Sequence, residues 1–174
     1  MPFTPFHMGA GLVAKAAIDR HFSVLTFGIA QIAMDIEPLI GMIRDADVLH
    51  GPTHTYIGAL AIGFAVILVS PFICRPILRR YNYEARAMRA SWLACPEHLS
   101  KGAVALGAFI GTLSHVLLDS LMHADVRPFW PVSNSNPLLG LVSVDAVYQL
   151  CFWLGAASAI AWLVGKYRHG RENG

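Results

Sequence analysis

Three ionisable residues in the second half of the chain recur at a helical spacing. His115 and Asp119 are four residues apart, and His123 follows after four more. In a helix this spacing places the side chains on one face, one turn apart. Imidazole nitrogen and carboxylate oxygen are ligands of catalytic zinc, and they also suit manganese or iron. The pattern therefore predicts part of a metal site. A buried His–Asp hydrogen bond between two membrane helices is the alternative.

A second acidic motif, Asp35-Ile-Glu37-Pro38, lies towards the end of an apolar run. Residues two apart do not share a helix face, but the residue before a proline avoids the helical region. We therefore expect the helix to end or kink at Pro38, so that both carboxylates turn towards one ion. Asp35 and Glu37 are then predicted metal ligands, with Glu37 or a ligand carboxylate accepting the proton of a water. The alternative is an acidic helix end at the depth of the lipid headgroups.

Histidines supply the remaining candidate ligands. His50 and His54 flank the turn signal Gly51-Pro52, and His7 lies near the start of the first apolar run. Taken singly, each of these histidines also fits an ordinary position at a membrane interface. Their significance depends on whether the fold brings them to one place.

The composition indicates that lipid surrounds much of this chain. Of its 174 residues, 55% are hydrophobic and 14% are charged, against about 25% charged in soluble domains. Four apolar runs approach the ~20 residues that a helix needs to cross a bilayer, and they cover residues 22–41, 55–73, 101–122 and 145–165. A shorter run, residues 5–18, suits a half-inserted helix. The predicted fold is an all-α, polytopic membrane bundle of four transmembrane helices plus a short N-terminal helix. It forms one domain with a basic loop at about 75–100.

Charge predicts the topology of these helices. Of the 13 lysines and arginines, 11 lie in three segments, residues 15–20, 75–101 and 166–171. The positive-inside rule places these segments in the cytoplasm of a bacterial inner membrane. The N-terminus and the connections 35–54 and 122–145 then lie on the outer, periplasmic face. If the first run is a loop instead, four spans remain and the orientation after residue 22 is unchanged.

This topology gathers the candidate ligands at one membrane face, where polar groups are usually functional or paired. The cluster is predicted to hold one to three divalent ions, with zinc as the first choice and manganese or iron as alternatives. The predicted ligands are His7, Asp35, Glu37, His50, His54, His115, Asp119 and His123. Arg127 lies on the same face. Its guanidinium could bind a substrate phosphate through two hydrogen bonds, and the alternative is an ion pair with Asp125. Asp125 itself is expected to be a solvated loop charge or a neighbour of the site.

The remaining composition excludes some classes of function. A net charge of +2 is too small to predict a nucleic-acid partner. The three cysteines have no metal-binding spacing and give no disulfide framework. The oligomeric state is left open.

The ligand motifs resemble those of the membrane-bound, predicted metal-dependent hydrolases that include the LexA-binding inner-membrane hydrolases. The blocks match in order over roughly residues 1–131, and they are His7-Met-Gly-Ala-Gly, Asp35-Ile-Glu37-Pro38, Gly51-Pro-Thr-His54-Thr, Ser114-His115-Val-Leu-Leu-Asp119 and Arg127-Pro-Phe-Trp130-Pro131. Two departures stand out. Glu37 replaces the family's second aspartate, and His50 lies one residue closer to the Thr-His pair than the family's histidine does.

A fainter similarity relates these residues to zinc-dependent phospholipases C and single-strand zinc nucleases. The first resemblance implies a membrane-bound, metal-dependent hydrolase, and the fainter one implies cleavage of a phosphoester by a metal-activated water. The predicted depth of the site adds a lipid as a candidate substrate and the bilayer as a partner. The alternatives are a metal-binding membrane protein without catalysis, a transporter component and a scaffold without metal.

Overall fold

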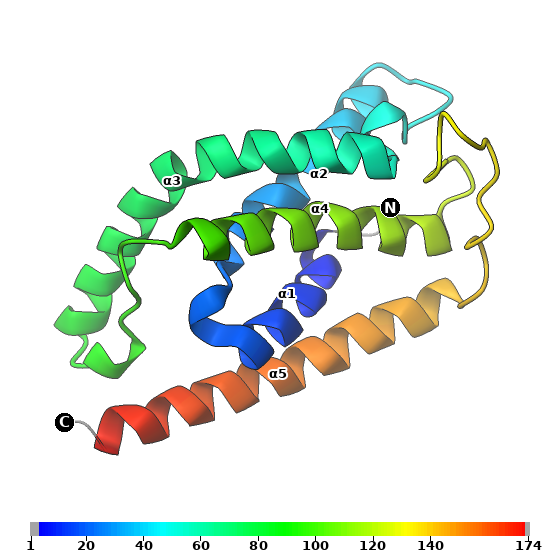
Figure 1. The fold of residues 1–174 in the computed structure, drawn as a ribbon. Helices are drawn as coiled ribbons and strands as arrows, with labels where there is room; N and C mark the ends of the chain where they lie inside the picture. The colour runs from blue at the N-terminus through cyan, green and yellow to red at the C-terminus, as the bar shows by residue number, and fades with distance from the viewer. Residues whose placement is uncertain (1–3, 173–174) are drawn as a thin grey trace.

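The computed structural model describes the backbone of residues 4–172 and the side chains of residues 6–168, and this part of the chain is all-helical. Arg171, which was assigned to the basic C-terminal segment, lies outside the described side chains. The five α-helices are α1 (Thr4–Ile18), α2 (Val24–Ile43), α3 (Tyr56–Ala87), α4 (Lys101–Met122) and α5 (Val144–Glu172). Short 3-10 turns lie at Asp19–His21, Pro52–His54 and Ser91–Leu93. Figure 1 shows α2, α3 and α4 as neighbours, with α1 crossing between them and α5.

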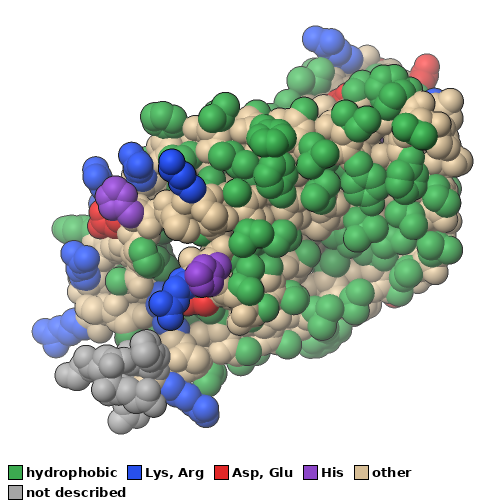
Figure 2. Space-filling view, in the orientation of Figure 1, with side chains coloured by type: hydrophobic (Ala, Val, Ile, Leu, Met, Phe, Trp, Pro, Cys, Tyr) green, Lys and Arg blue, Asp and Glu red, His purple; other side chains and the backbone are tan. Residues whose placement is uncertain are grey.

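Four of these helices are long and apolar enough to cross a membrane, which confirms the predicted fold class. They are α2, α3, α4 and the described part of α5. Large apolar side chains point away from the bundle on these helices, including Phe64, Phe72 and Trp153. Figure 2 shows hydrophobic side chains spread over the middle of the visible face. Such a surface fits lipid tails rather than water.

Two helices extend beyond the predicted runs. The third run was expected to end at residue 73, yet α3 continues to Ala87. A helix of 32 residues is about 48 Å long, so its charged last turns extend past a hydrocarbon layer of ~30 Å. Pro71 and Pro76 lie inside α3, and Figure 1 shows the helix bending in its second half, as prolines cause. α5 similarly continues past residue 165.

An end or a kink of the α2 helix was expected at Pro38, and the end is wrong. The helix continues to Ile43 with Pro38 buried inside it. A proline has no amide hydrogen and so removes one helical hydrogen bond, but the residues on either side still form the helix. Asp35 and Glu37 therefore remain on a regular helix, where positions two apart point to different sides.

Small residues let the helices that carry the site approach closely. A Cβ added at Gly111 of α4 would lie 2.6 Å from the Cβ of Ala30 on α2. Two small buried clusters join α2, α3 and α4: Ala30, Val66 and Ala108 form one, and Met34, Ala59 and Val116 form the other. Gly9 has the same role between α1 and α5, since its Cβ would overlap the carbonyl oxygen of Cys151. Close backbone approach through small residues is how membrane helices associate.

The two ends of the bundle differ in charge. The last turns of α2 and α4 and the start of α3 meet at one end, here called the cluster end (Figure 1). Most lysines and arginines gather at the opposite end, here called the basic end (Figure 2). The sequence places no Asp, Glu, Lys, Arg or His within residues 24–34, 55–74, 102–114 or 146–165. Ionisable groups are therefore confined to the two ends.

Candidate metal centre

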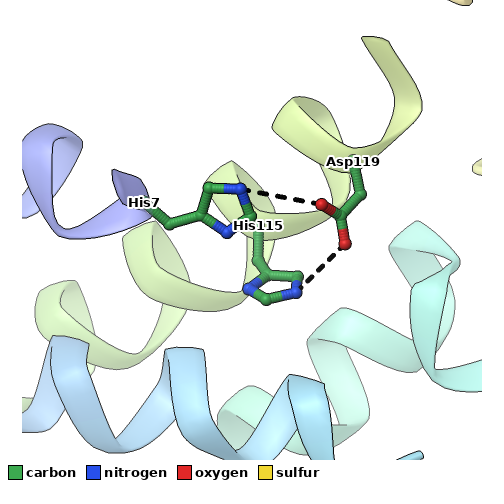
Figure 3. A group of neighbouring side chains, drawn as sticks. All are labelled: His7, His115 and Asp119. Carbon is green, nitrogen blue, oxygen red and sulfur yellow. Dashed lines mark ion pairs between the residues drawn. The ribbon is translucent and has the colours of Figure 1, made fainter. Parts of the chain in front are cut away.

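One buried carboxylate, Asp119, lies at the centre of a group of five histidines. Its side chain is almost fully enclosed on the last turns of α4. The Nε2 atoms of His115, His54 and His50 lie 3.2, 3.4 and 3.9 Å from its Oδ2 atom. The Nε2 atoms of His7 and His123 lie 3.6 and 4.0 Å from its Oδ1 atom. Figure 3 shows His7 and His115 reaching the two oxygens of this carboxylate.

Three parts of the chain bring these histidines together: α1, the segment before α3, and α4 with the residue that follows it. His7 comes from the first turns of α1, and His115 lies one turn before Asp119 on α4. His54 ends the 3-10 turn before α3, and Thr55 caps that helix by accepting the amide hydrogen of Gly58. The structure thus brings together predicted site residues that are up to 116 positions apart in the sequence.

The ring of His115 is fixed from behind by Gln31 on α2. The Gln31 amide nitrogen donates to the carbonyl oxygen of Gly111 at 3.0 Å, which turns its Oε1 atom towards His115. The Nδ1–H of His115 donates to this oxygen at 2.7 Å. In a neutral imidazole the other nitrogen, Nε2, is then a lone-pair acceptor. This Nε2 faces Asp119 and also Asp35, whose Oδ1 atom lies 3.4 Å away.

His54 and His50 are oriented by acceptors in the same way. The Nδ1 atom of His54 lies 3.0 Å from the Thr53 hydroxyl and 3.5 Å from the Glu37 carboxylate. The Nδ1–H of His50 donates to the Asp125 carboxylate at 2.9 Å. Both rings therefore turn Nε2 towards the centre. A carboxylate or carbonyl on the outer nitrogen is the usual support of a metal-binding histidine.

Buried imidazole nitrogens and carboxylate oxygens face one another at the centre. The Nε2 atoms of His7, His54, His115 and His123 are buried, and none has a hydrogen-bond partner in the described structure. In neutral His54 and His115, whose Nδ1 atoms face acceptors, Nε2 turns a lone pair towards the carboxylate oxygens, and these repel; an unsatisfied buried polar atom is also costly. A cation between them removes both penalties. Ligands on a tetrahedral zinc at 2.0–2.1 Å are about 3.3 Å apart, and the four shortest separations at Asp119 and Asp35 lie close to that value. The donor set therefore fits a zinc-like ion.

The groups at the edge of the centre have pKa values that suit ligands. Burial lowers the pKa of His7 to about 4, despite the nearby Asp119 carboxylate. Burial likewise lowers the pKa of His123. Burial alone would raise the pKa of Asp125, but hydrogen bonds from His50 and from the Leu49 amide outweigh it and lower the value. Neutral imidazoles and an ionised carboxylate are the forms that bind metals.

The candidate ligand atoms fall into overlapping groups rather than one. There are four such groups: His7, His115 and Asp119; Asp35, His54 and His115; His50, His54 and Asp119; and His50, His123 and Asp125. A cavity of about 210 Å³ is lined by residues of several of these groups, among them Asp35, His50 and Asp119. The cluster therefore offers more than one position for an ion, and the cavity gives space for a small molecule beside it.

Glu37 takes a position that differs from the expectation of an ion shared with Asp35. It does not turn towards Asp35 and the centre. Its Oε2 atom instead accepts hydrogen bonds from the amides of Gly51 and Thr53 and from the Thr53 hydroxyl. Glu37 thereby holds the loop that carries His54. Arg127 is exposed and lines a cavity of about 260 Å³ together with His50 and Asp125. Asp125 binds His50 rather than standing free as a loop charge.

Sequence reasoning missed Gln31 altogether and left the role of Asp125 open. A signal for Gln31 was present, because it is a polar residue in a membrane span four residues before Asp35. That spacing places both on one helix face. No sequence pattern predicts the contact of Asp125 with His50, because the two residues are 75 positions apart and lie in two different loops.

Gln31 offers a direct test of how His115 is oriented. We expect Gln31→Leu to lower zinc affinity by about 10- to 100-fold, because the ring loses the acceptor that fixes its tautomer and position. Titration of the purified protein against a competing zinc chelator measures this. Gln149→Leu is the matched control, since Gln149 is an exposed amide on α5. Equal affinities of the Gln31 variant and the wild type would show that Gln31 does not support a metal ligand.

The fold and the site together define a class: a polytopic, all-helical membrane protein with a buried histidine–carboxylate cluster at one end of its bundle. Within that class the chain matches the family model described as YdjM inner membrane protein over residues 1–172. The chain therefore belongs to the YdjM inner membrane protein family. No curated protein and no solved structure matches it.

Proposed function

We propose that this protein is a membrane-bound, metal-dependent hydrolase that cleaves a phosphoester, with a lipid headgroup as the substrate class. The observation that carries the proposal is the convergence of five imidazole Nε2 atoms on the Asp119 carboxylate, four of them without a hydrogen-bond partner. A divalent ion bound there supplies Lewis acidity and lowers the pKa of a water ligand towards about 7.

The residues around the cavity are placed to accept a proton, to position a metal ligand and to bind the substrate phosphate. Asp35 lines the cavity of about 210 Å³ and reaches the centre, so it is placed to accept a proton from water. Glu37, the other predicted acceptor, is engaged by the loop at Gly51 and Thr53 and positions His54. Arg127 lies at the adjoining cavity, which shares His50 and Asp125 with the first. Its guanidinium is suited to orient a phosphate by two hydrogen bonds.

The open side of the centre favours catalysis over a purely structural metal. Structural zinc sites are closed by four protein ligands, whereas catalytic sites keep a position for water. The cavity beside Asp119 supplies that position. A transport path would require ionisable groups through the depth of the membrane, and the sequence confines them to the two ends of the spans. The positive-inside rule supports a periplasmic location of the cluster end.

The test is hydrolysis by the protein in lipid nanodiscs loaded with Zn²⁺ or Mn²⁺. We expect release of headgroup phosphate from a phospholipid, or cleavage of a soluble phosphodiester, and loss of both with chelator. Asp35→Asn is expected to lower kcat by about 100-fold or more, the usual contribution of a proton acceptor. Metal content is measured alongside, because Asp35 is also a predicted metal ligand.

Arg127→Ala is expected to raise KM more than it lowers kcat, since the guanidinium orients substrate. Arg44→Ala is its matched control, because Arg44 is an exposed arginine in the other loop of the cluster end. Metal-loaded protein that cleaves neither substrate would refute the hydrolase proposal and leave a non-catalytic metal protein.

A further inference from the structure

The largest cavity among those described lies far from the metal centre, at the basic end. It measures about 400 Å³ and opens between α1, the turn after it, the start of α4 and the second half of α5. Figure 2 shows the molecule hollowed at this end, next to Lys, Arg and His side chains. This volume lies within the ~300–1,000 Å³ typical of ligand pockets. None of the candidate metal ligands lines it.

The wall of this cavity is apolar, and its rim is cationic. Leu12, Leu25, Leu78 and Leu163 contribute to the wall. The rim carries three permanent cations, Lys15, Arg20 and Lys166, against one carboxylate, Asp19. A rim with three positive charges and one negative charge has an excess of two positive charges. An apolar pocket with a positive rim is complementary to an anionic amphiphile.

The two rim lysines are held in place rather than extended into solvent. The Lys166 ammonium donates to the carbonyl oxygens of Leu93 and Ala94, both at 2.9 Å. These are neutral acceptors, so its charge is not cancelled by them. Lys15 pairs with Asp19 at 3.0 Å. Both ammonium groups face the Trp162 ring, at 4.9 Å for Lys166 and 5.7 Å for Lys15.

Trp162 fixes the depth of this rim in the membrane. Its indole Nε1–H donates to Asp19 at 2.8 Å, and its ring lines the cavity. Tryptophan prefers the boundary between headgroups and hydrocarbon. The rim therefore lies where lipid phosphates are found, while the wall continues into the hydrocarbon region. Basic pockets between membrane helices bind the headgroups of anionic lipids.

We propose that this cavity is a binding site for an anionic glycerophospholipid from the leaflet at the basic end. Its phosphate lies against Lys166, Lys15 and Arg20, and one acyl chain enters the apolar pocket. The lipid fills the space between α1, α4 and α5, so it fixes α1 against the rest of the bundle. This site is independent of the hydrolase proposal, because it lies at the other end of the molecule.

The experiment measures lipid retained by detergent-purified protein after exchange into phosphatidylglycerol or phosphatidylcholine, using native mass spectrometry. We expect about one phosphatidylglycerol per chain and no retained phosphatidylcholine. Lys166→Gln is expected to weaken retention at least 10-fold. Arg168→Gln removes the same charge from an exposed position on the same helix and is expected to leave retention unchanged.

A second pair of variants tests the pocket rather than the charge. Ala159→Trp fills the cavity and is expected to abolish retention, whereas Ala157→Trp on the exposed side of α5 is not. Circular dichroism and thermal unfolding of each variant report whether the fold is intact. Equal effects of the Lys166 and Arg168 variants, or equal retention of phosphatidylcholine, would overturn the proposal. Displacement of the lipid by soluble glycerol phosphate would also overturn it, because the site would then recognise free phosphate.

Discussion

Asp119→Asn is expected to lower zinc affinity by at least about 100-fold. The substitution keeps the size of the side chain but removes the negative charge on which five Nε2 atoms converge. Changes to the outer partners of metal ligands cost about 10- to 100-fold, and Asp119 is placed as a ligand itself. Equilibrium competition with a chelator of known zinc affinity measures the change. Secondary structure by circular dichroism is expected to stay the same, because α4 is long and Asn is tolerated near a helix end.

Asp145→Asn provides the control for this substitution. Asp145 is an exposed carboxylate in the first turn of α5, so the variant loses the same charge without touching the centre. We expect its zinc affinity to equal that of the wild type. If both aspartate variants bind zinc as the wild type does, the cluster around Asp119 is not the metal site.

Removing the metal is expected to lower the melting temperature on the order of 10 °C. A ligand present at 1,000 times its Kd stabilises the folded state by about 4.1 kcal/mol, and each kcal/mol shifts Tm by about 2–4 °C in a chain of this size. The physical cause is the set of unpartnered buried Nε2 atoms at His7, His54 and His115, which face carboxylates when no cation lies between them. Thermal unfolding in detergent with zinc or with chelator measures the shift.

The Asp119→Asn variant is the internal control for this experiment. Its melting temperature is expected to shift by at most about 3–6 °C between zinc and chelator. A site weakened about 100-fold is then only about 10-fold above its Kd, which stabilises the folded state by about 1.4 kcal/mol. If the melting temperature of the wild type is the same with zinc and with chelator, the proposed role of the ion is contradicted, even if zinc binds elsewhere on the surface.

The sequence predicted the helices well because hydrophobicity is a local property. The α4 helix begins and ends at the predicted residues, 101 and 122. The end of α3 was missed, since hydropathy stops at Arg75 while the hydrogen-bonded helix continues through charged residues to Ala87. Pro38 was misread for a related reason. A proline inside a buried helix removes one hydrogen bond, and packing against neighbours compensates for that loss.

The candidate site was predictable in its residue types and its end of the bundle, but not in its contacts. The structure places His7, Asp35, His54, His115 and Asp119 together, as their positions in the runs indicated; their role as ligands stays a prediction. Periodicity predicts which face of a helix a residue occupies, but it does not predict which residue of a neighbouring helix or loop that residue contacts. The contact of Glu37 with the Thr53 loop and that of Asp125 with His50 depend on loop conformation, which no local pattern determines.

The metal content of the protein, purified from cells without added metal, tests the central claim most directly. Elemental analysis of the wild type is expected to give at least one zinc, manganese or iron per chain, with background values for the Asp119→Asn variant. A wild-type protein that carries no metal and takes up none on titration with zinc, manganese or iron would contradict a cation at the cluster end.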